Sequence, residues 1–220
     1  MPKNTKMGVF GAGGHAKVVL DTLECLGRYV VVGLLDANVE MHGTTRWGYK
    51  VLGGRDQFAA LQRRGVTRLI IALGDNRHRQ AAFEDAVKAG FELVAVVHPS
   101  AQVGSRVKIG PGSLLVAGTI VNVDAVLGEN VIVNSGATVD HDCRIGAHVH
   151  ISPGVHLAGN VTIGELAHIG IGAVVLPNLK IGRNSVVGAG AVVLEDVPDG
   201  IVVAGNPARP IRNDEGSRGL

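Results

Sequence analysis

An aliphatic residue recurs at every sixth position through the second half of the chain. The run starts at Val103 and reaches Val193 without an exception. If about a third of positions were aliphatic and placed at random, such a run would have odds on the order of one in ten million or less. A fixed period constrains the fold more than any local pattern, because each repeat must place its side chain in the same environment. The positions are Val103, Ile109, Leu115, Val121, Leu127, Val133, Val139, Ile145, Ile151, Leu157, Ile163, Ile169, Val175, Ile181, Val187 and Val193.

Two weaker periods accompany the first. Small or β-branched residues stand two positions before the aliphatic ones, at Ala101, Val107, Ser113, Thr119, Ala125, Val131, Ala137 and Cys143. Glycine follows the aliphatic residue every eighteen positions, at Gly110, Gly128, Gly146, Gly164 and Gly182. These spacings predict a β-helix whose coils take eighteen residues each, with three flat sides and small side chains at the corners.

Composition agrees with a repeat built on tight turns, since the chain has 32 glycines but only 1 Trp, 2 Tyr and 4 Phe. The 220 residues allow two domains of about 100 residues. A net charge of +2 without a basic block argues against nucleic acid as a partner. Two cysteines, Cys25 and Cys143, give neither a disulfide framework nor a thiolate metal cluster, which fits a reducing cytoplasm. No apolar run is long enough to predict a membrane span.

Residues 103–193 resemble the hexapeptide-repeat acyltransferases. The resemblance implies a left-handed parallel β-helix, acetyl-CoA as co-substrate, and a homotrimer with active sites between adjacent β-helices. A purely structural β-solenoid is the alternative.

The first hundred residues alternate between strand and helix patterns. We expect strands near residues 7–10, 29–35, 68–73 and 93–97, with helices near 17–26 and 79–89. This order predicts a small Rossmann-like parallel sheet in an α/β domain over residues 1–98, followed by a β-helix domain and C-terminal tail over 99–220. A ligand crevice belongs at the carboxyl ends of the strands, where residues 11–15, Asp36 and Gly74 stand.

Gly11, Gly13 and Ala16 satisfy a G-x-G-x-x-A spacing, and Asp36 ends the next predicted strand. Free N–H groups at a helix start suit a diphosphate, and a strand-end carboxylate suits ribose hydroxyls or a base edge. A nicotinamide dinucleotide and a nucleotide-sugar both offer these groups. The alternative is that the glycines only permit a tight turn.

The segment G-A-G-G-H-A-K-V at residues 11–18, followed by a short α/β domain and hexapeptide repeats, narrows the resemblance. It is similar to the sugar O- and N-acyltransferases that include bacillosamine and sialic acid acetyltransferases, and most of all to the GDP-perosamine N-acetyltransferases. The resemblance implies a role in lipopolysaccharide biosynthesis and a nucleotide-sugar held by the N-terminal domain. The matching positions are Gly13, Gly14, His15, Asp36, Ala37 and Gly74.

Five of the nine histidines lie between residues 141 and 168. We expect His148, His150, His156 and His168 at positions of the six-residue repeat that face outward, with His150 and His168 stacked in successive coils. For His148, His156 and His168 the simplest interpretation is a row of histidines exposed on the surface of the β-helix. A zinc site of the γ-type carbonic anhydrases is the alternative, but those enzymes use a histidine pair five residues apart, a spacing absent here. No metal is expected.

His141 stands at a predicted corner, where another subunit could approach. Acyl transfer to an amine or hydroxyl needs a base, and imidazole titrates near neutral pH. A carboxylate on the other ring nitrogen fixes its tautomer, and Asp142 or Asp140 could supply it. The resemblance makes His141 the base and Asp142 its partner, although the bacillosamine enzymes carry Glu in place of Asp142.

The resemblance assigns further contacts. Asn134 matches a position that contacts the acceptor sugar near its amine, and His150 one that contacts acetyl-CoA. Gly159, Ile171 and Ala189 match the region that lines the pantetheine, and the Gly159 N–H could serve as an oxyanion donor. Residues 204–209 match a closing segment beside the CoA site, and residues beyond Asn213 are expected to be disordered.

These assignments predict an acetyl-CoA-dependent N-acetyltransferase acting on the 4-amino group of a nucleotide-linked sugar. A sugar O-acetyltransferase of the sialic acid type, a nicotinamide oxidoreductase and a non-catalytic assembly module remain as alternatives. The sequence leaves the nucleotide base and the sugar open.

Overall fold

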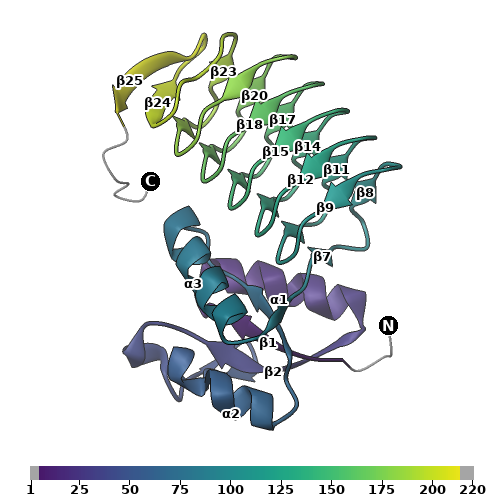
Figure 1. The fold of residues 1–220 in the computed structure, drawn as a ribbon, viewed down its shortest axis with the longest axis vertical. Coiled ribbons are helices and arrows are strands. Elements are labelled where there is room, and N and C mark those ends of the chain that lie inside the picture. The colour runs from purple at the N-terminus through teal and green to yellow at the C-terminus, as the bar shows by residue number, and fades with distance from the viewer. Residues whose placement is uncertain (1–4, 214–220) are drawn as a thin grey trace. The chain divides into compact units, whose positions relative to one another are not determined.

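The computed structural model describes residues 5–213 of the chain (Figure 1). Two compact units divide it, Met1–Pro99 and Ser100–Leu220. Among the helices of this described part, none is both long and apolar enough to cross a membrane. The expectation for the tail beyond Asn213 lies outside the described residues.

The first unit is an α/β fold around a parallel sheet of four strands in the order β2-β1-β5-β6. The chain passes from β1 to β2 on one side and reaches β5 on the other side of β1, so the switch point of this sheet lies between β1 and β5. The elements are β1 (Thr5–Phe10), α1 (Gly14–Leu26), β2 (Tyr29–Leu35), β3 (Thr45–Arg46), β4 (Tyr49–Lys50), α2 (Phe58–Arg63), β5 (Arg68–Ile71), α3 (Asn76–Lys88), β6 (Glu92–Leu93) and β7 (Val96–Val97), with 3-10 turns at Val39–Met41 and Arg55–Gln57.

Apolar side chains from the sheet and helices form the core of this unit. Phe10, Phe58 and Phe91 make edge-on ring contacts, with centroids 6.1 Å apart for the first two and 5.1 Å for the last two. Central strands β1 and β5 are buried on both faces, as parallel strands covered by helices must be. The sequence missed the α2 helix and the β3–β4 hairpin, because each is too short to show a period.

The second unit is a parallel β-helix in which strands of two residues alternate with four-residue corners. Each strand pairs with the strand eighteen residues later, as Leu115 does with Val133 and Val121 with Val139. Three sheets result, and the predicted fold class is confirmed. The strands are β8 (Gln102–Val103), β9 (Lys108–Ile109), β10 (Leu114–Leu115), β11 (Ile120–Val121), β12 (Val126–Leu127), β13 (Ile132–Val133), β14 (Thr138–Val139), β15 (Arg144–Ile145), β16 (His150–Ile151), β17 (His156–Leu157), β18 (Thr162–Ile163), β19 (His168–Ile169), β20 (Val174–Val175), β21 (Lys180–Ile181), β22 (Val186–Val187) and β23 (Val192–Val193).

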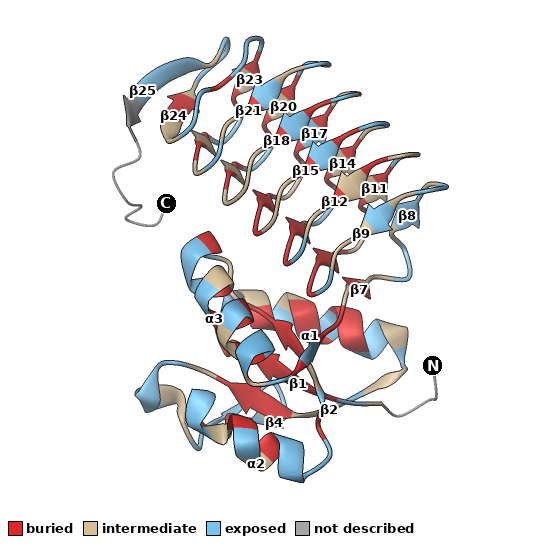
Figure 2. Cartoon of the chain, in the orientation of Figure 1, coloured by how far each residue is buried: buried red, intermediate tan, exposed pale blue. Residues whose placement is uncertain are grey.

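The aliphatic residues that recur at every sixth position point inward, as the period predicts. From Leu115 to Val193 all of them are buried, while Val103 and Ile109 in the first coil keep some exposure (Figure 2). The residues two positions earlier fill the inside of the corners, and Cys143 and Ala137 are fully buried there. The six-residue period is therefore the period of core packing.

Each corner needs one residue in the left-handed region. Glycine fills some of these positions, and Asp or Asn fills most of the others, since these residues tolerate positive φ best among the rest. Asp142 has φ of 60° and Asn160, one coil later, has φ of 58°. The periodic glycines serve another purpose, because a Cβ on Gly128 would lie 2.8 Å from the Ala147 backbone nitrogen of the next coil.

A hairpin ends the β-helix. Strand β24 (Ile201–Ala204) pairs in parallel with β22, and β25 (Arg209–Asn213) pairs antiparallel with β24. Residues 205–208 form the turn of this hairpin, and Ala204 pairs with Arg209 on either side of it, so the segment predicted to close the repeat does so by a change of strand direction.

Candidate functional site

His141 lies in the corner that follows strand β14. The corner turns through Asp142, whose positive φ brings its carboxylate alongside the preceding imidazole. The distance from His141 Nδ1 to Asp142 Oδ2 is 2.8 Å, and both side chains are more than half exposed. An ionised carboxylate only accepts, so Nδ1 donates and the lone pair of Nε2 faces outward for a substrate proton.

Asp140 holds the backbone of the same corner. Its Oδ1 accepts from the His141 backbone N–H at 2.7 Å and from Asn122 Nδ2 at 2.8 Å. Of the two acids that the sequence offered as partners of the ring, Asp142 is the one in contact with it. The hydrogen bond to Asp142, together with the charges of Asp140 and Asp142, raises the pKa of His141 above 6.5.

Gly159 lies directly against the His141 ring, one coil later in the same corner. A Cβ on Gly159 would be 2.6 Å from both Cε1 and Nε2 of the imidazole. The absence of a side chain at this position is therefore what leaves room for the ring. Within residues 5–213, no acceptor is recorded for the Gly159 N–H, so this donor remains available beside the imidazole.

An acidic and basic ladder continues along the same corner. Arg106 donates to both carboxylate oxygens of Asp124, at 2.6 and 2.7 Å. The pKa of Arg106 is raised mainly by its hydrogen bonds to Asp124 and by the charge of that residue. Asp142 occupies the equivalent position one coil later, and its charge adds to this increase. The proposed base thus belongs to a row of polar groups rather than standing alone.

Asn134 and His150 meet at a different corner, between the sheet that contains β13 and the one that contains β14. Asn134 Nδ2 lies 3.3 Å from His150 Nε2. The His150 ring packs edge-on against His168, with centroids 4.9 Å apart, and His168 Nε2 reaches Ser152 Oγ at 3.2 Å. The predicted stacking of His150 and His168 is confirmed, and His150 is largely buried by its neighbours.

Ile171 and Ala189 line the same corner as Asn134. The Gly190 N–H donates to the Ile171 carbonyl at 2.8 Å, which fixes these residues in successive coils. Ile171 leaves 62% of its surface exposed, an unusual state for a large aliphatic side chain. The site residues of one chain therefore fall into two groups. One corner holds Asn134, His150, Ile171 and Ala189, and the next corner holds His141, Asp142 and Gly159.

The prediction for His148 was wrong. This residue is not on an outward strand position but in the left-handed position of a corner, with φ of 59° and 3% exposure. Its Nδ1 accepts from Asn130 Nδ2 at 2.9 Å. The side chain is part of the packing of that corner. His156 is exposed as expected, with its Nδ1 2.9 Å from Thr138 Oγ1.

The glycine turn of the first unit stands at the switch point of the sheet. Gly11 has φ of 127°, and a Cβ there would be 2.5 Å from the Ala72 carbonyl oxygen, so this glycine is required by the fold. Gly13, Gly14 and Gly74 differ, because a Cβ on any of them would meet nothing within 4 Å. Packing does not explain these three glycines. Open space around them suits a ligand that approaches the backbone closely.

Asp36 braces this turn from the end of β2. Its Oδ2 accepts from the Ala12 N–H at 2.7 Å, and its Oδ1 accepts from the Asn38 N–H at 2.9 Å. Each oxygen keeps one lone pair for a further donor. Ala37, the next residue, is exposed at the same edge.

His15, next to the glycine turn, lies close enough to Arg79 to feel the charge of its guanidinium. Burial and the nearby Arg79 charge lower the pKa of His15 to about 4, so its imidazole is neutral at physiological pH. Arg79 is fully buried and donates to the Gly74 carbonyl at 3.0 Å and to Asn76 Oδ1 at 2.8 Å. Burial lowers the pKa of this guanidinium to about 9.

Arg79 is the residue that sequence reasoning missed. It holds the Gly74 turn in place from inside helix α3. A signal was present, because Arg79 shares its helical face with Ala82, Phe83 and Ala86, all buried. A cation on the apolar face of an amphipathic helix indicates a buried polar contact.

Two family models match the chain. Residues 6–86 match the PglD N-terminal domain, and residues 124–159 and 160–195 match the bacterial transferase hexapeptide (six repeats). Among curated proteins, none matches significantly.

Solved structures resemble nearly the whole chain. PerB from Caulobacter crescentus, in complex with CoA and GDP-perosamine, is 41% identical with a TM-score of 0.90, over 94% of this chain and 97% of that one. The acetyltransferase domain of PglB from Neisseria gonorrhoeae is 41% identical with a TM-score of 0.88, over 94% and 100%. WeeI from Acinetobacter baumannii is 31% identical with a TM-score of 0.83, over 94% and 100%. The PglB domain has also been solved with acetyl coenzyme A.

Proposed function

Because the chain belongs to the hexapeptide-repeat sugar O- and N-acyltransferases, we propose that it transfers an acetyl group from acetyl-CoA to the 4-amino group of a nucleotide-linked sugar, with GDP-perosamine as the preferred acceptor. The chain is an acyltransferase. Two relatives at 41% identity support the finer assignment, one with CoA and GDP-perosamine and the other with acetyl coenzyme A. The observation that carries the proposal is the His141–Asp142 pair.

The pair supplies a base of the right form. Nδ1 of His141 donates to Asp142, so Nε2 is free to accept the proton that the amine loses as its nitrogen attacks the thioester carbonyl. Asp142 stabilises the resulting imidazolium. When the tetrahedral intermediate collapses, the C–S bond breaks and His141 returns the proton to the departing sulfur. The imidazole ends the cycle neutral.

The Gly159 N–H supports the same step. Gly159 itself lies against the His141 ring, and its N–H meets no acceptor among the described residues, so it can donate to the oxygen of the tetrahedral intermediate. This role agrees with the position of Gly159 in the region that the resemblance assigns to the pantetheine.

For the N-terminal unit we propose the binding of the nucleotide-sugar. The open glycines Gly13, Gly14 and Gly74 would admit the diphosphate at the start of helix α1, where N–H groups and the helix dipole favour an anion. Asp36 and Ala37 would contact the ribose or the base. His15, neutral at the working pH, would donate or accept without adding charge.

A homotrimer is part of the proposal. One corner holds Asn134, His150, Ile171 and Ala189. Another, on the other side of the sheet that contains β14, holds His141 and Gly159. If all of them serve one acetyl transfer, a neighbouring copy must supply one of the two groups. A reducing cytoplasm, which suits the free thiols of Cys25 and Cys143, and a role in lipopolysaccharide biosynthesis complete the proposal.

A thiol-release screen tests the acceptor. GDP-, UDP- and dTDP-linked 4-amino sugars, and the matching 4-hydroxy sugars, are each incubated with acetyl-CoA and the full chain. We expect CoA release with 4-amino sugars and the fastest release with GDP-perosamine. Release with the hydroxyl acceptors alone would replace the proposal by O-acetylation, and release with none would contradict transferase activity on these sugars.

We expect Asp142→Asn to move the acidic limb of the kcat profile to lower pH. Asp142 raises the pKa of His141, so the wild-type base form accumulates only above that raised value; without the carboxylate the base form persists at lower pH. The plateau rate should fall at least ~10-fold, because the tautomer is no longer fixed. Asp142→Glu should restore both the limb and much of the rate. An unchanged limb in the Asn variant would show that Asp142 does not tune this base.

Gly13→Val should raise the KM for the nucleotide-sugar by about 10-fold or more while the protein stays folded, since the new side chain fills open space above the turn. The KM for acetyl-CoA should not change. Gly11→Ala is the contrasting variant, because its Cβ would collide with Ala72; we expect a lower melting temperature there. Wild-type KM in Gly13→Val would remove this turn from the sugar site.

A further inference from the structure

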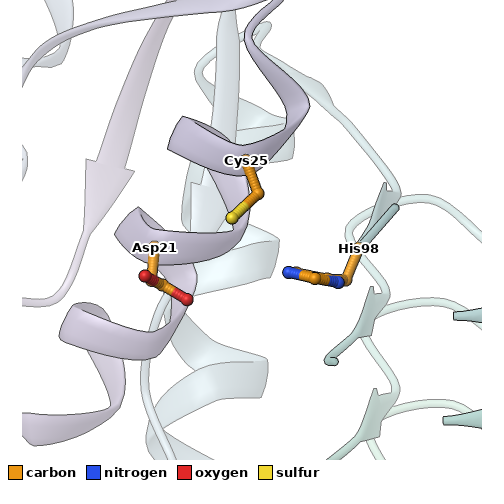
Figure 3. Close-up of side chains that lie close together, drawn as sticks. All are labelled: Asp21, Cys25 and His98. Carbon is orange, nitrogen blue, oxygen red and sulfur yellow. The ribbon is translucent and has the colours of Figure 1, made fainter. Parts of the chain in front are cut away.

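Helix α1 presents two potential metal ligands on one exposed face. Asp21 and Cys25 are four residues apart, so their side chains lie one turn above one another (Figure 3). The opposite face of the helix, with Val19, Leu20 and Leu23, is buried in the core of the unit. Both ligand side chains are exposed, and neither forms a hydrogen bond or ion pair with another described residue. No packing role explains this pair.

His98 supplies a third ligand from a distant part of the sequence. It follows strand β7, which packs beside α1, and its ring points toward Asp21 and Cys25 (Figure 3). One ligand atom from each of the three residues lies within 4.8 Å of the others. In a tetrahedral zinc site such atoms are roughly 3.3–3.8 Å apart, a difference that small rotations of these side chains can close.

We propose that Asp21, Cys25 and His98 bind a zinc ion, with a water molecule as the fourth ligand. A carboxylate oxygen, a thiolate and an imidazole nitrogen together form a donor set that favours zinc over magnesium or calcium, which prefer oxygen alone. Asp21 and Cys25 are exposed, so water reaches the cluster. Because His98 ends the first unit and α1 belongs to its core, the ion would tie the end of this unit to its helix.

This site lies outside the chemistry proposed for His141. The absence of metal was predicted from the spacing of the β-helix histidines and from the two cysteines, which are too few for a thiolate cluster. The cluster here uses none of those histidines, and it needs only one thiolate. Cys25 is also the accessible thiol of the chain, since Cys143 is buried and burial raises the pKa of its thiol.

The test is zinc binding by the full chain, measured in competition with a chromophoric chelator. We expect one equivalent of zinc to bind, and Cys25→Ala to weaken it by at least ~100-fold, given that even outer partners of a metal site are worth 10- to 100-fold. His98→Gln and Asp21→Asn should each weaken it as well. All three positions are on the surface or near it, and far-ultraviolet circular dichroism verifies that the variants fold.

A matched control and a spectroscopic signature separate this site from adventitious binding. His78 is exposed on helix α3, 3.4 Å from Asp75, and His78→Gln should leave the affinity unchanged. Cobalt in place of zinc should give a sulfur-to-metal charge-transfer band that Cys25→Ala abolishes. No zinc bound to the wild type, or equal affinity in wild type and Cys25→Ala, would overturn the proposal. Neither measurement depends on acetyl transfer, so the proposed function stands or falls separately.

Discussion

His141→Asn is expected to lower kcat for acetyl transfer by about 10³-fold while leaving both KM values nearly unchanged. Asparagine keeps a polar group near the position of Nδ1 but has no nitrogen that accepts a proton near neutral pH. The fold is kept because the His141 side chain is exposed in a corner and contributes nothing to the core, so both substrate sites should still bind. Steady-state rates of CoA release, with each substrate varied in turn, measure the effect.

The matched control for that variant is His156→Asn. His156 is exposed on the outward face of strand β17, which pairs with β14, and contacts Thr138 rather than a carboxylate. We expect wild-type kcat there. A rate for His141→Asn within about 10-fold of the wild type would exclude His141 as the base.

Gly159→Val is expected to lower kcat by about 100-fold without a loss of stability, because displacement of a catalytic group by about 1 Å can cost that much. A side chain here occupies the space of the imidazole, at 2.6 Å from its Cε1 and Nε2. The ring is exposed and can swing away, so the fold tolerates the change while the contact with Asp142 is lost. The new side chain also shifts the backbone N–H of residue 159, and this shift contributes part of the loss in kcat.

The pH profile distinguishes this explanation from a general defect. With the Asp142 contact broken, the pKa of His141 falls, so the acidic limb of kcat should shift to lower pH, as in Asp142→Asn. A Gly159→Val enzyme with an unaltered rate would show that the ring does not need this space.

Much of the fold followed from spacing. The six-residue period assigned inward positions correctly from Leu115 to Val193, because a side chain in a regular coil has the same neighbours in every turn. The corner of His141 and the stacking of His150 on His168 followed from the same arithmetic. His148 was misplaced because the step of two residues between it and His150 crosses from a corner into a strand.

The sequence predicted the glycine turn only in part. Its spacing predicted a strand, a turn and a helix, and all three are present. The sequence could not separate Gly11, which the fold requires, from Gly13 and Gly14, which it does not. That distinction depends on Ala72, which lies far from Gly11 in the sequence, since only a neighbour in space can forbid a Cβ.

What the sequence determined by itself is the repeat, the two kinds of unit and the corner that contains His141, all of which rest on local spacing. The tertiary structure decided which acid contacts His141, what leaves room for its ring, and that Asp36 already braces the glycine turn. It also placed His98 beside Asp21 and Cys25. Hydrogen bonds, burial and metal ligation depend on distances of a few ångströms between residues that the chain keeps far apart, and only the folded packing sets those distances.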